Sequence, residues 1–127
     1  MARHIINTDR APEAVGPYSQ AVAAGGLIFA SGQLGLDPAT GQFVGYTAAA
    51  QIRQAIENIA AVLRAAGSDL SQVVKTTLYL VNMDDFPKVN QVYAEFFPHD
   101  PPARATVEVS NLPLSGLVEI EVVAYRP

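Results

Sequence analysis

Apolar residues recur along the chain with two different periods, and each period predicts one kind of element. Over Thr47–Ala66 they recur at steps of three and four, which predicts an amphipathic helix; its apolar stripe consists of Ile52, Ile56, Ile59 and Leu63. Thr47 suits the N-cap of this helix, and Gly67 suits the first position beyond its end.

The same period returns further along the chain and predicts a second helix. This helix is expected to begin at a cap formed by Asn82 or Asp84 and to run to about Phe97, with Pro87 tolerated in its first turn. Its apolar face consists of Phe86, Val89, Tyr93 and Phe96. The prolines that follow end the helix because they cannot continue its hydrogen bonding.

The remaining apolar runs predict strands. Gly25 and Gly26 separate two of these runs and favour a tight hairpin between them. The predicted strands are Arg3–Asn7, Gln20–Ala24, Leu27–Ser31, Val73–Val81, Arg104–Val109 and Val118–Tyr125. The order β-β-β-α-β-α-β-β indicates one α+β domain over residues 1–127, with both helices on one face of a mixed sheet.

The second face of this sheet is predicted to be mixed in character. In the last strand, Val118, Ile120, Val122 and Ala124 point one way, while the other side carries Glu119, Glu121, Val123 and Tyr125. Likewise Arg104 and Thr106 share a face opposite to Ala105. A face that carries both acids and large apolar side chains is compatible with a subunit interface, so an oligomer is favoured.

Charge and composition remove several classes of function. The chain has 8 basic and 12 acidic residues, a net charge of −4 and no run of basic residues, which disfavours a nucleic-acid partner. Cysteine is absent and only two histidines occur, so disulfides and thiolate chemistry are excluded, and a zinc site or a Ser-His-Asp triad is disfavoured. No nucleotide-binding or metal motif occurs either, and we expect no cofactor and no metal.

The N-terminal segment lacks the apolar core of a secretory signal. The longest hydrophobic stretch, Ala21–Ala30, is interrupted by glycines and too short to span a bilayer. We therefore expect a cytoplasmic protein without a membrane partner.

Arg104 is the first candidate for a binding residue, because it stands where a proline-rich loop enters a strand. Its planar guanidinium can bind a carboxylate through two parallel hydrogen bonds. The alternative is a structural ion pair with Glu108, Glu119 or Glu121. Glu119 is a candidate for moving a proton or holding a water, with an exposed acid on an alternating strand as its alternative.

Two turns add polar groups near glycine or proline. Gly16–Ser19 and Ser31–Gln33 offer hydroxyl and backbone donors to a small anion, although ordinary turns have the same composition.

Several motifs, in order along nearly the whole chain, resemble the RidA/YjgF family. They are the segment GPYSQAV, the stretch LIFASGQLGLDPATGQ, the helix-strand-helix region from QIRQAIENIA to VYAEFF, and the closing segments PPARATVEVSNLP and VEIEVVA. This resemblance implies a chorismate-mutase-like fold, a homotrimer with active sites in the clefts between subunits, and hydrolysis of 2-iminopropanoate and 2-iminobutanoate to 2-keto acids and ammonia.

The resemblance also assigns roles to particular residues. Arg104 matches the arginine that binds the substrate carboxylate, and Glu119 matches the glutamate that positions the hydrolytic water. The residues matching the rest of the substrate pocket are Tyr18, Ser31, Gly32, Asn90 and Thr106. Many members have a cysteine where this chain has Thr106; the backbone contact there can survive, whereas thiol-dependent behaviour is put in doubt. Hydrolysis itself needs no thiol, because water is the nucleophile.

Three other functions stay open at this stage. One is a non-catalytic sensor that binds keto or amino acids in the same cleft through Arg104. Another is an endoribonuclease, an activity ascribed to some members, against which the acidic charge argues. The last is a related deaminase of pyrimidine catabolism that acts on a different enamine, so the substrate is not fixed by the resemblance.

Overall fold

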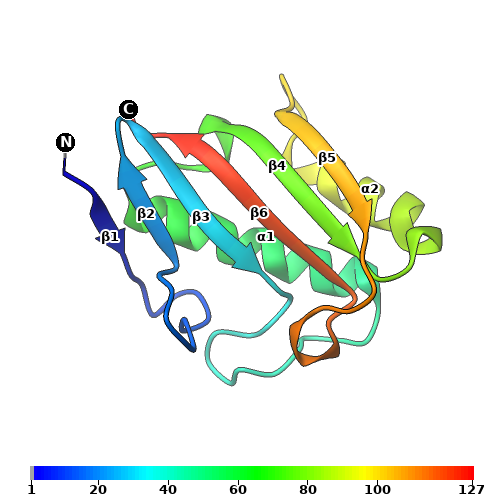
Figure 1. The fold of residues 1–127 in the computed structure, drawn as a ribbon. Coiled ribbons are helices and arrows are strands. Elements are labelled where there is room, and N and C mark those ends of the chain that lie inside the picture. Colours follow the sequence, from blue (N-terminus) through cyan, green and yellow to red (C-terminus); the bar gives the residue numbers. More distant parts are fainter. Residues whose placement is uncertain (1) are drawn as a thin grey trace.

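The strands and helices follow the hydrophobic pattern closely over residues 2–127, the part of the chain that the computed structural model describes (Figure 1). The elements are β1 (His4–Ile6), β2 (Ala21–Ala24), β3 (Leu27–Gln33), α1 (Ala48–Ala65), β4 (Val73–Leu80), α2 (Phe86–Phe96), β5 (Ala103–Glu108) and β6 (Val118–Tyr125), with 3-10 turns at Leu70–Gln72, Met83–Asp85 and Pro113–Ser115. Predicted and observed boundaries differ by a few residues at most, the start of α2 differing most.

The sheet has six strands in the order β1-β2-β3-β6-β4-β5. Neighbouring strands are antiparallel except β4 and β5, which run parallel at one edge. A parallel pair needs a long connection to return the chain to the same end of the sheet, and α2 lies in that connection. The predicted α+β architecture with a mixed sheet is therefore confirmed.

The core lies between the helices and one face of the sheet. All four residues of the predicted apolar stripe of α1 are fully buried, against Ile28, Leu78 and Ile120 of the strands among others. Thr47 caps the helix as predicted, because its hydroxyl accepts from the backbone N–H of Ala50 at 3.1 Å. Gly67 follows the helix end with φ +81°, a conformation that glycine adopts without strain.

The second helix begins later than predicted. Asn82 does act as a cap, but its side chain accepts from the N–H of Asp84 at 2.9 Å and so caps the 3-10 turn Met83–Asp85. The α-helix starts only at Phe86, without a side-chain cap, and Pro87 lies in its first turn. Local hydrogen bonding by Asn82 thus competes with the α-helical geometry over three residues.

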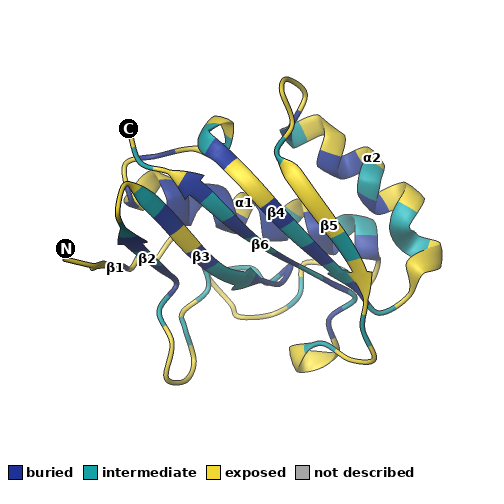
Figure 2. Ribbon diagram, turned by 45° about the horizontal axis from the view of Figure 1, so that its top comes forward, coloured by how far each residue is buried: buried dark blue, intermediate teal, exposed yellow. Residues whose placement is uncertain are grey.

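The face of the sheet opposite the helices is uncovered (Figure 2). It carries the large apolar side chains of Phe29, Val107 and Tyr125, each more than two-fifths exposed, together with the acids of β6. This is the mixed face that the strand alternation predicts. None of the helices in the described residues is long and apolar enough to cross a membrane.

Two candidate half-sites at the sheet

Glu119 lies at a cavity of about 340 Å³ at one end of the sheet. Its walls come from the segment before β2, the end of β3 with the loop after it, the 3-10 turn Pro113–Ser115 and β6. The lining residues are Pro12, Glu13, Ala14, Val15, Tyr18, Gln20, Gly32, Gln33, Leu34, Leu36, Pro113, Leu114 and Glu119. This cavity is the Glu119 half-site. Most of its lining is apolar, and it contains no lysine or arginine.

Gly32 gives the Glu119 carboxylate its place. A β-carbon at position 32 would lie 2.7 Å from Oε2 of Glu119 and 2.8 Å from its carboxyl carbon. Both distances are shorter than a van der Waals contact, so only glycine leaves room for the carboxylate here. The strand pairing is irregular at this point, since the register of β3 against β6 shifts between Ala30 and Gln33. A bulge of this kind turns a strand locally and is common beside functional sites.

The half-buried position of Glu119 changes its acidity. Burial, and to a lesser extent the negative charge of Glu121 two residues along the same strand, raise the pKa of Glu119 above that of an ordinary glutamate. Glu121 itself accepts a hydrogen bond from the hydroxyl of Tyr79 on β4, and this bond raises the pKa of Tyr79. A carboxylate with a raised pKa in a cavity can accept a proton from water and return it near neutral pH.

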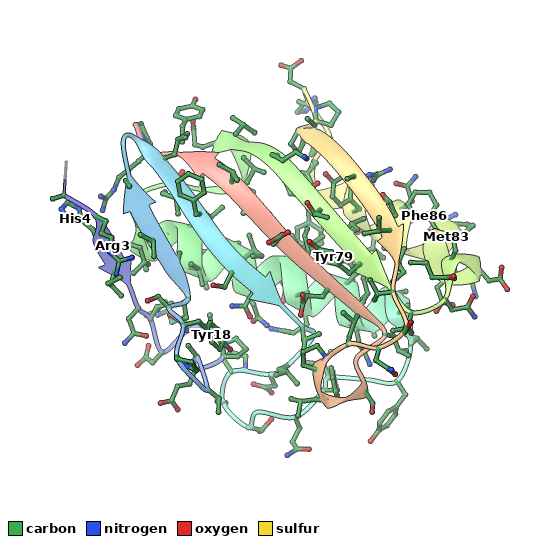
Figure 3. All side chains as sticks on the ribbon, in the orientation of Figure 1. Arg3, His4, Tyr18, Tyr79, Met83 and Phe86 are labelled. Carbon is green, nitrogen blue, oxygen red and sulfur yellow. The ribbon has the colours of Figure 1, made fainter. Side chains whose placement is uncertain are left out.

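Few other polar groups of the cavity are available to a ligand. The side-chain amide of Gln20 is bonded to the backbone of Thr8 and Pro12, so it serves to hold the N-terminal segment. Tyr18 is about half exposed and lies in the loop below the sheet (Figure 3). Ser31 adjoins Gly32 but does not line the cavity, because its hydroxyl donates to the carbonyl of Ser19 at 2.6 Å.

Arg104 lies in a different cavity, the Arg104 half-site, which has a volume of about 400 Å³. Asn90, Tyr93, Ala94 and Phe97 line it from α2 and the residue beyond, and Pro101, Pro102 and Arg104 line it from the loop and β5. The guanidinium donates to Oδ1 of Asn90 at 2.8 Å. It also lies 4.7 Å from the ring centre of Tyr93 and 5.3 Å from that of Phe86, within the range of cation–π attraction.

None of the carboxylates proposed as structural partners of Arg104 pairs with it. Glu108 accepts from the backbone N–H of Met83 at 2.8 Å, Glu121 is bonded to Tyr79, and Glu119 belongs to the other cavity. The ion pair found among residues 2–127 joins Arg53 to Glu95 on the two helices. The Arg104 guanidinium is thus fixed by neutral groups, and its charge is available to an anion.

The side chains of Arg104 and Glu119 point to opposite faces of the sheet. Arg104 stands directly across from Thr76, whose hydroxyl is hydrogen bonded to Tyr93 beneath α2 at 2.8 Å. Glu119 stands across from Tyr79, three positions further along the same strand as Thr76. Paired residues point to the same side and successive residues alternate, so Arg104 faces the helices and Glu119 faces the uncovered side. Figure 3 shows Tyr79 on the uncovered face of the sheet and Phe86 at the start of α2.

The candidate residues are therefore divided between two places. Tyr18, Gly32 and Glu119 line one cavity, while Asn90 and Arg104 line the other. Thr106 is half-buried on the same face as Arg104, two residues along β5, and lines neither cavity.

Sequence reasoning missed two contributions. The helical period places Tyr93 only on the buried face of α2, although its ring also lies against the Arg104 guanidinium. The turn at Pro113–Ser115 carried no helical or strand period that would mark it as a cavity wall. Within the described chain, no group of three or more His, Cys, Asp or Glu side chains is placed to hold a metal ion.

Comparisons with known proteins place this geometry in a family. The family model described as Endoribonuclease L-PSP matches residues 8–126. A RutC family protein from Pyrococcus horikoshii is 50% identical over 124 residues, covering 98% of each chain. The 2-iminobutanoate/2-iminopropanoate deaminase of Bos taurus is 49% identical over 126 residues, covering 99% of this chain and 92% of the bovine protein.

A solved structure agrees with these relatives. The crystal structure of E. coli TdcF with bound serine superimposes with a TM-score of 0.93 at 38% identity, covering 98% of this chain and 99% of that one. Sequence and fold agree over almost the whole length, and the chain belongs to the RidA/YjgF/L-PSP family, which includes the RutC proteins.

Proposed function

We propose that this protein hydrolyses 2-imino acids, among them 2-iminopropanoate and 2-iminobutanoate, to 2-keto acids and ammonia. The observation that carries the proposal is the unpaired guanidinium of Arg104, held by Asn90 and two aromatic rings, together with a half-buried Glu119 in a second cavity. The relatives named as deaminases of these imines, at close to half identity, support the same reaction.

The active site is proposed to form between two copies of the chain. Arg104 and Glu119 point to opposite faces of the sheet. Within one copy, the Arg104 cavity therefore has a cation that can bind a carboxylate but no proton acceptor, and the Glu119 cavity has a proton acceptor but no cation. A homotrimer, as the family resemblance implies, would join the Arg104 half-site of one copy to the Glu119 half-site of its neighbour. The large apolar side chains on the uncovered sheet face support such an association.

In the proposed mechanism Arg104 binds the substrate carboxylate, and the protonated C=N group lies against the neighbour's Glu119. Water attacks the iminium carbon while Glu119 takes one of its protons, which gives a neutral carbinolamine. Glu119 then donates this proton to the nitrogen and takes the proton of the new hydroxyl as the C–N bond breaks. It finally passes that proton to the departing ammonia, which regenerates the carboxylate. One iminium ion and one water yield one keto acid and one ammonium ion.

Two effects of the protein are sufficient for this chemistry. Imines hydrolyse unaided in water, so only a modest acceleration is required of the enzyme. Holding water, imine carbon and carboxylate together reduces the entropic barrier. A positioned acid–base group contributes about 10²- to 10⁴-fold more.

The test is imine hydrolysis by the purified protein. An amino-acid oxidase or a threonine dehydratase generates the imine, and semicarbazide traps whatever remains. Wild-type protein should lower semicarbazone formation, and Arg104→Ala should abolish that effect. Arg104→Lys should recover only part of it, because an ammonium lacks the planar fork. If the wild type leaves semicarbazone formation unchanged with every imine tested, hydrolysis is excluded.

A second candidate is a sensor that binds small carboxylic acids without turning them over. The bound serine of the TdcF crystal structure favours this alternative. Glu119→Gln separates the two functions, since it should stop hydrolysis while leaving carboxylate binding at Arg104 in place. If the protein is a sensor, calorimetry should show keto-acid binding by both the wild type and Glu119→Gln, and neither of them should hydrolyse an imine.

A further inference from the structure

The turn between β5 and β6 has an unusual backbone. Leu114 has φ +57° and Ser115 has φ +60°, two consecutive non-glycine residues in the left-handed region. Asp100 is the other such residue in the described chain. A β-carbon crowds the carbonyl in this conformation, so glycine would be favoured at both positions. A leucine and a serine occupy them instead, and such strain marks candidate functional positions.

The strained turn presents an apolar side chain to the cavity of Glu119. Leu114 lines that cavity and is 69% exposed. Val15 lies on the lining from the N-terminal segment and is 83% exposed, and Leu36 and Pro113 add further apolar surface. An aliphatic side chain stabilises the fold by being buried, so the exposed side chains of Leu114 and Val15 contribute little to folding stability.

The charges of the cavity decide which part of a ligand can lie here. Among its lining residues Glu119 and Glu13 are acids and none is basic, so a substrate carboxylate is repelled from it. The other end of a 2-imino acid is its side chain. A cavity of about 340 Å³ is far larger than the methyl group of 2-iminopropanoate needs, so longer aliphatic groups fit.

We infer that Leu114 is a specificity-determining residue, which the strained turn holds against the substrate side chain to favour 2-imino acids with aliphatic side chains. Val15 forms the second side of the same contact. This inference rests on the proposed function, because it takes Arg104 as the carboxylate site and Glu119 as the group at the reacting carbon.

The experiment compares imines of increasing side-chain length, generated from alanine, 2-aminobutyrate and leucine. For the wild type, kcat/KM should rise along this series. Leu114→Ala should lower kcat/KM for the leucine-derived imine by about five- to tenfold and leave the alanine-derived imine within about twofold. A fully enclosed hydrophobic pocket distinguishes substrates that differ by one methylene by a larger factor in kcat/KM. We expect a smaller factor here because Leu114 is exposed.

Two further variants separate specificity from folding. Val15→Ala lies in another segment and should show the same selective loss without touching the turn. Ser115→Gly is the matched control, because it relieves the neighbouring backbone strain and keeps the leucine. It should raise the melting temperature and leave the ratio of kcat/KM values unchanged.

Keto-acid binding gives a readout that does not depend on hydrolysis. Calorimetry should show that wild type binds 4-methyl-2-oxopentanoate more tightly than pyruvate and that Leu114→Ala loses this preference. If the wild type shows the preference but hydrolyses no imine, the proposed function fails and the role of Leu114 stands. The role of Leu114 is overturned if Leu114→Ala reduces all imines equally or keeps the wild-type preference.

Discussion

At the scale of single residues, the environment that raises the pKa of Glu119 also suits the proton transfer that we propose for it. Burial removes water from the carboxylate, and Glu121 adds a like charge on the same face of β6. The other titratable groups near these two acids are Tyr79 and Lys75 on β4 and, around the cavity, Glu13 and Tyr18. Within one copy of the chain, Glu121 is therefore the neighbour whose charge adds to the effect of burial on the pKa of Glu119.

The first prediction concerns pH. In the proposed mechanism hydrolysis requires ionised Glu119, so kcat/KM should fall as pH decreases through the raised pKa, at a higher pH than for an ordinary glutamate. Glu121→Gln removes the like charge, lowers that pKa and should move the acidic limb to lower pH. Burial still raises the pKa of Glu119 in this variant, so the acidic limb should stay at a higher pH than an ordinary glutamate would give. Measuring kcat/KM against pH checks this.

Glu13→Gln is the control for the pH prediction, because Glu13 lines the same cavity but does not contribute to the pKa shift of Glu119. Its acidic limb should coincide with that of the wild type. A limb that moves equally in both variants would show that Glu121 has no specific influence.

The second prediction concerns Gly32. In Gly32→Ala the new β-carbon would meet the carboxylate of Glu119 at 2.7 Å, and the flexible carboxylate should move rather than the backbone. A displacement of about 1 Å can cost about 10²-fold in rate, so kcat should fall at least tenfold with little change in melting temperature.

Gly26→Ala provides the opposite control for Gly32→Ala. Gly26 has φ +79°, and no atom lies within 4 Å of the added β-carbon. That variant should lose stability by about 1 kcal/mol and keep full activity. If Gly32→Ala behaves in the same way, the close approach to Glu119 has no catalytic importance.

At the scale of elements, helix α1 also holds the loops that form the cavity walls. Buried Asn58 donates through Nδ2 to the carbonyls of Leu34 and Leu36 at 3.2 and 2.9 Å. Buried Gln51 donates to the carbonyl of Gly45 and accepts from the N–H of Leu117. These amides take the place of strand pairing along loops that have little regular structure of their own.

The third prediction follows from Asn58. Asn58→Ala leaves two carbonyls without their donor, and the variant should lose about 1–3 kcal/mol in the free energy of unfolding. KM should rise as well, since Leu34 and Leu36 line the cavity. Urea denaturation gives the first quantity and steady-state kinetics the second. Glu57→Ala, at an exposed position of the same helix, should stay within about 0.5 kcal/mol of wild type.

Sequence patterns predicted the elements well and the walls of the site poorly. The stripe of α1 and the alternation of β6 follow from one period each, and they correctly placed Glu119 on the uncovered face. The Leu114–Ser115 turn could not be predicted, because both residues oppose the local preference for glycine and cost roughly 1–3 kcal/mol each. The contact of Arg104 with Tyr93 depends on packing between β5 and α2, which no local period encodes.

At the scale of the whole molecule, the two faces of the sheet carry complementary halves of the proposed site. Arg104 and Glu119 cannot act on one small substrate within a single copy, because the sheet lies between their side chains. The family resemblance implies roles for these two residues, while only the strand register shows that their side chains are separated.

The fourth prediction uses this separation. Arg104→Ala and Glu119→Gln should each be inactive alone, but unfolding and refolding them together should restore activity. In a ring with one site per interface, about a quarter of the sites in an equal mixture combine two intact halves. The measurement is imine hydrolysis before and after co-refolding.

Refolding each variant separately and then combining them briefly is the control, and it should restore nothing while subunits do not exchange. If co-refolded mixtures stay inactive although mixed oligomers form, the site does not combine Arg104 and Glu119 from different copies.

Because Arg104 and Glu119 have opposite orientations, a ligand bound in the proposed intersubunit site would link two copies of the chain. A small acid that touches one chain with its carboxylate and the next with its remaining atoms binds only where the chains meet. Its binding energy therefore adds to the cohesion of the assembly, by about 2.7 kcal/mol per occupied site at a concentration one hundred times its Kd. Under the proposed function, an imino acid that the protein hydrolyses would also stabilise the assembly, most strongly while that acid is abundant.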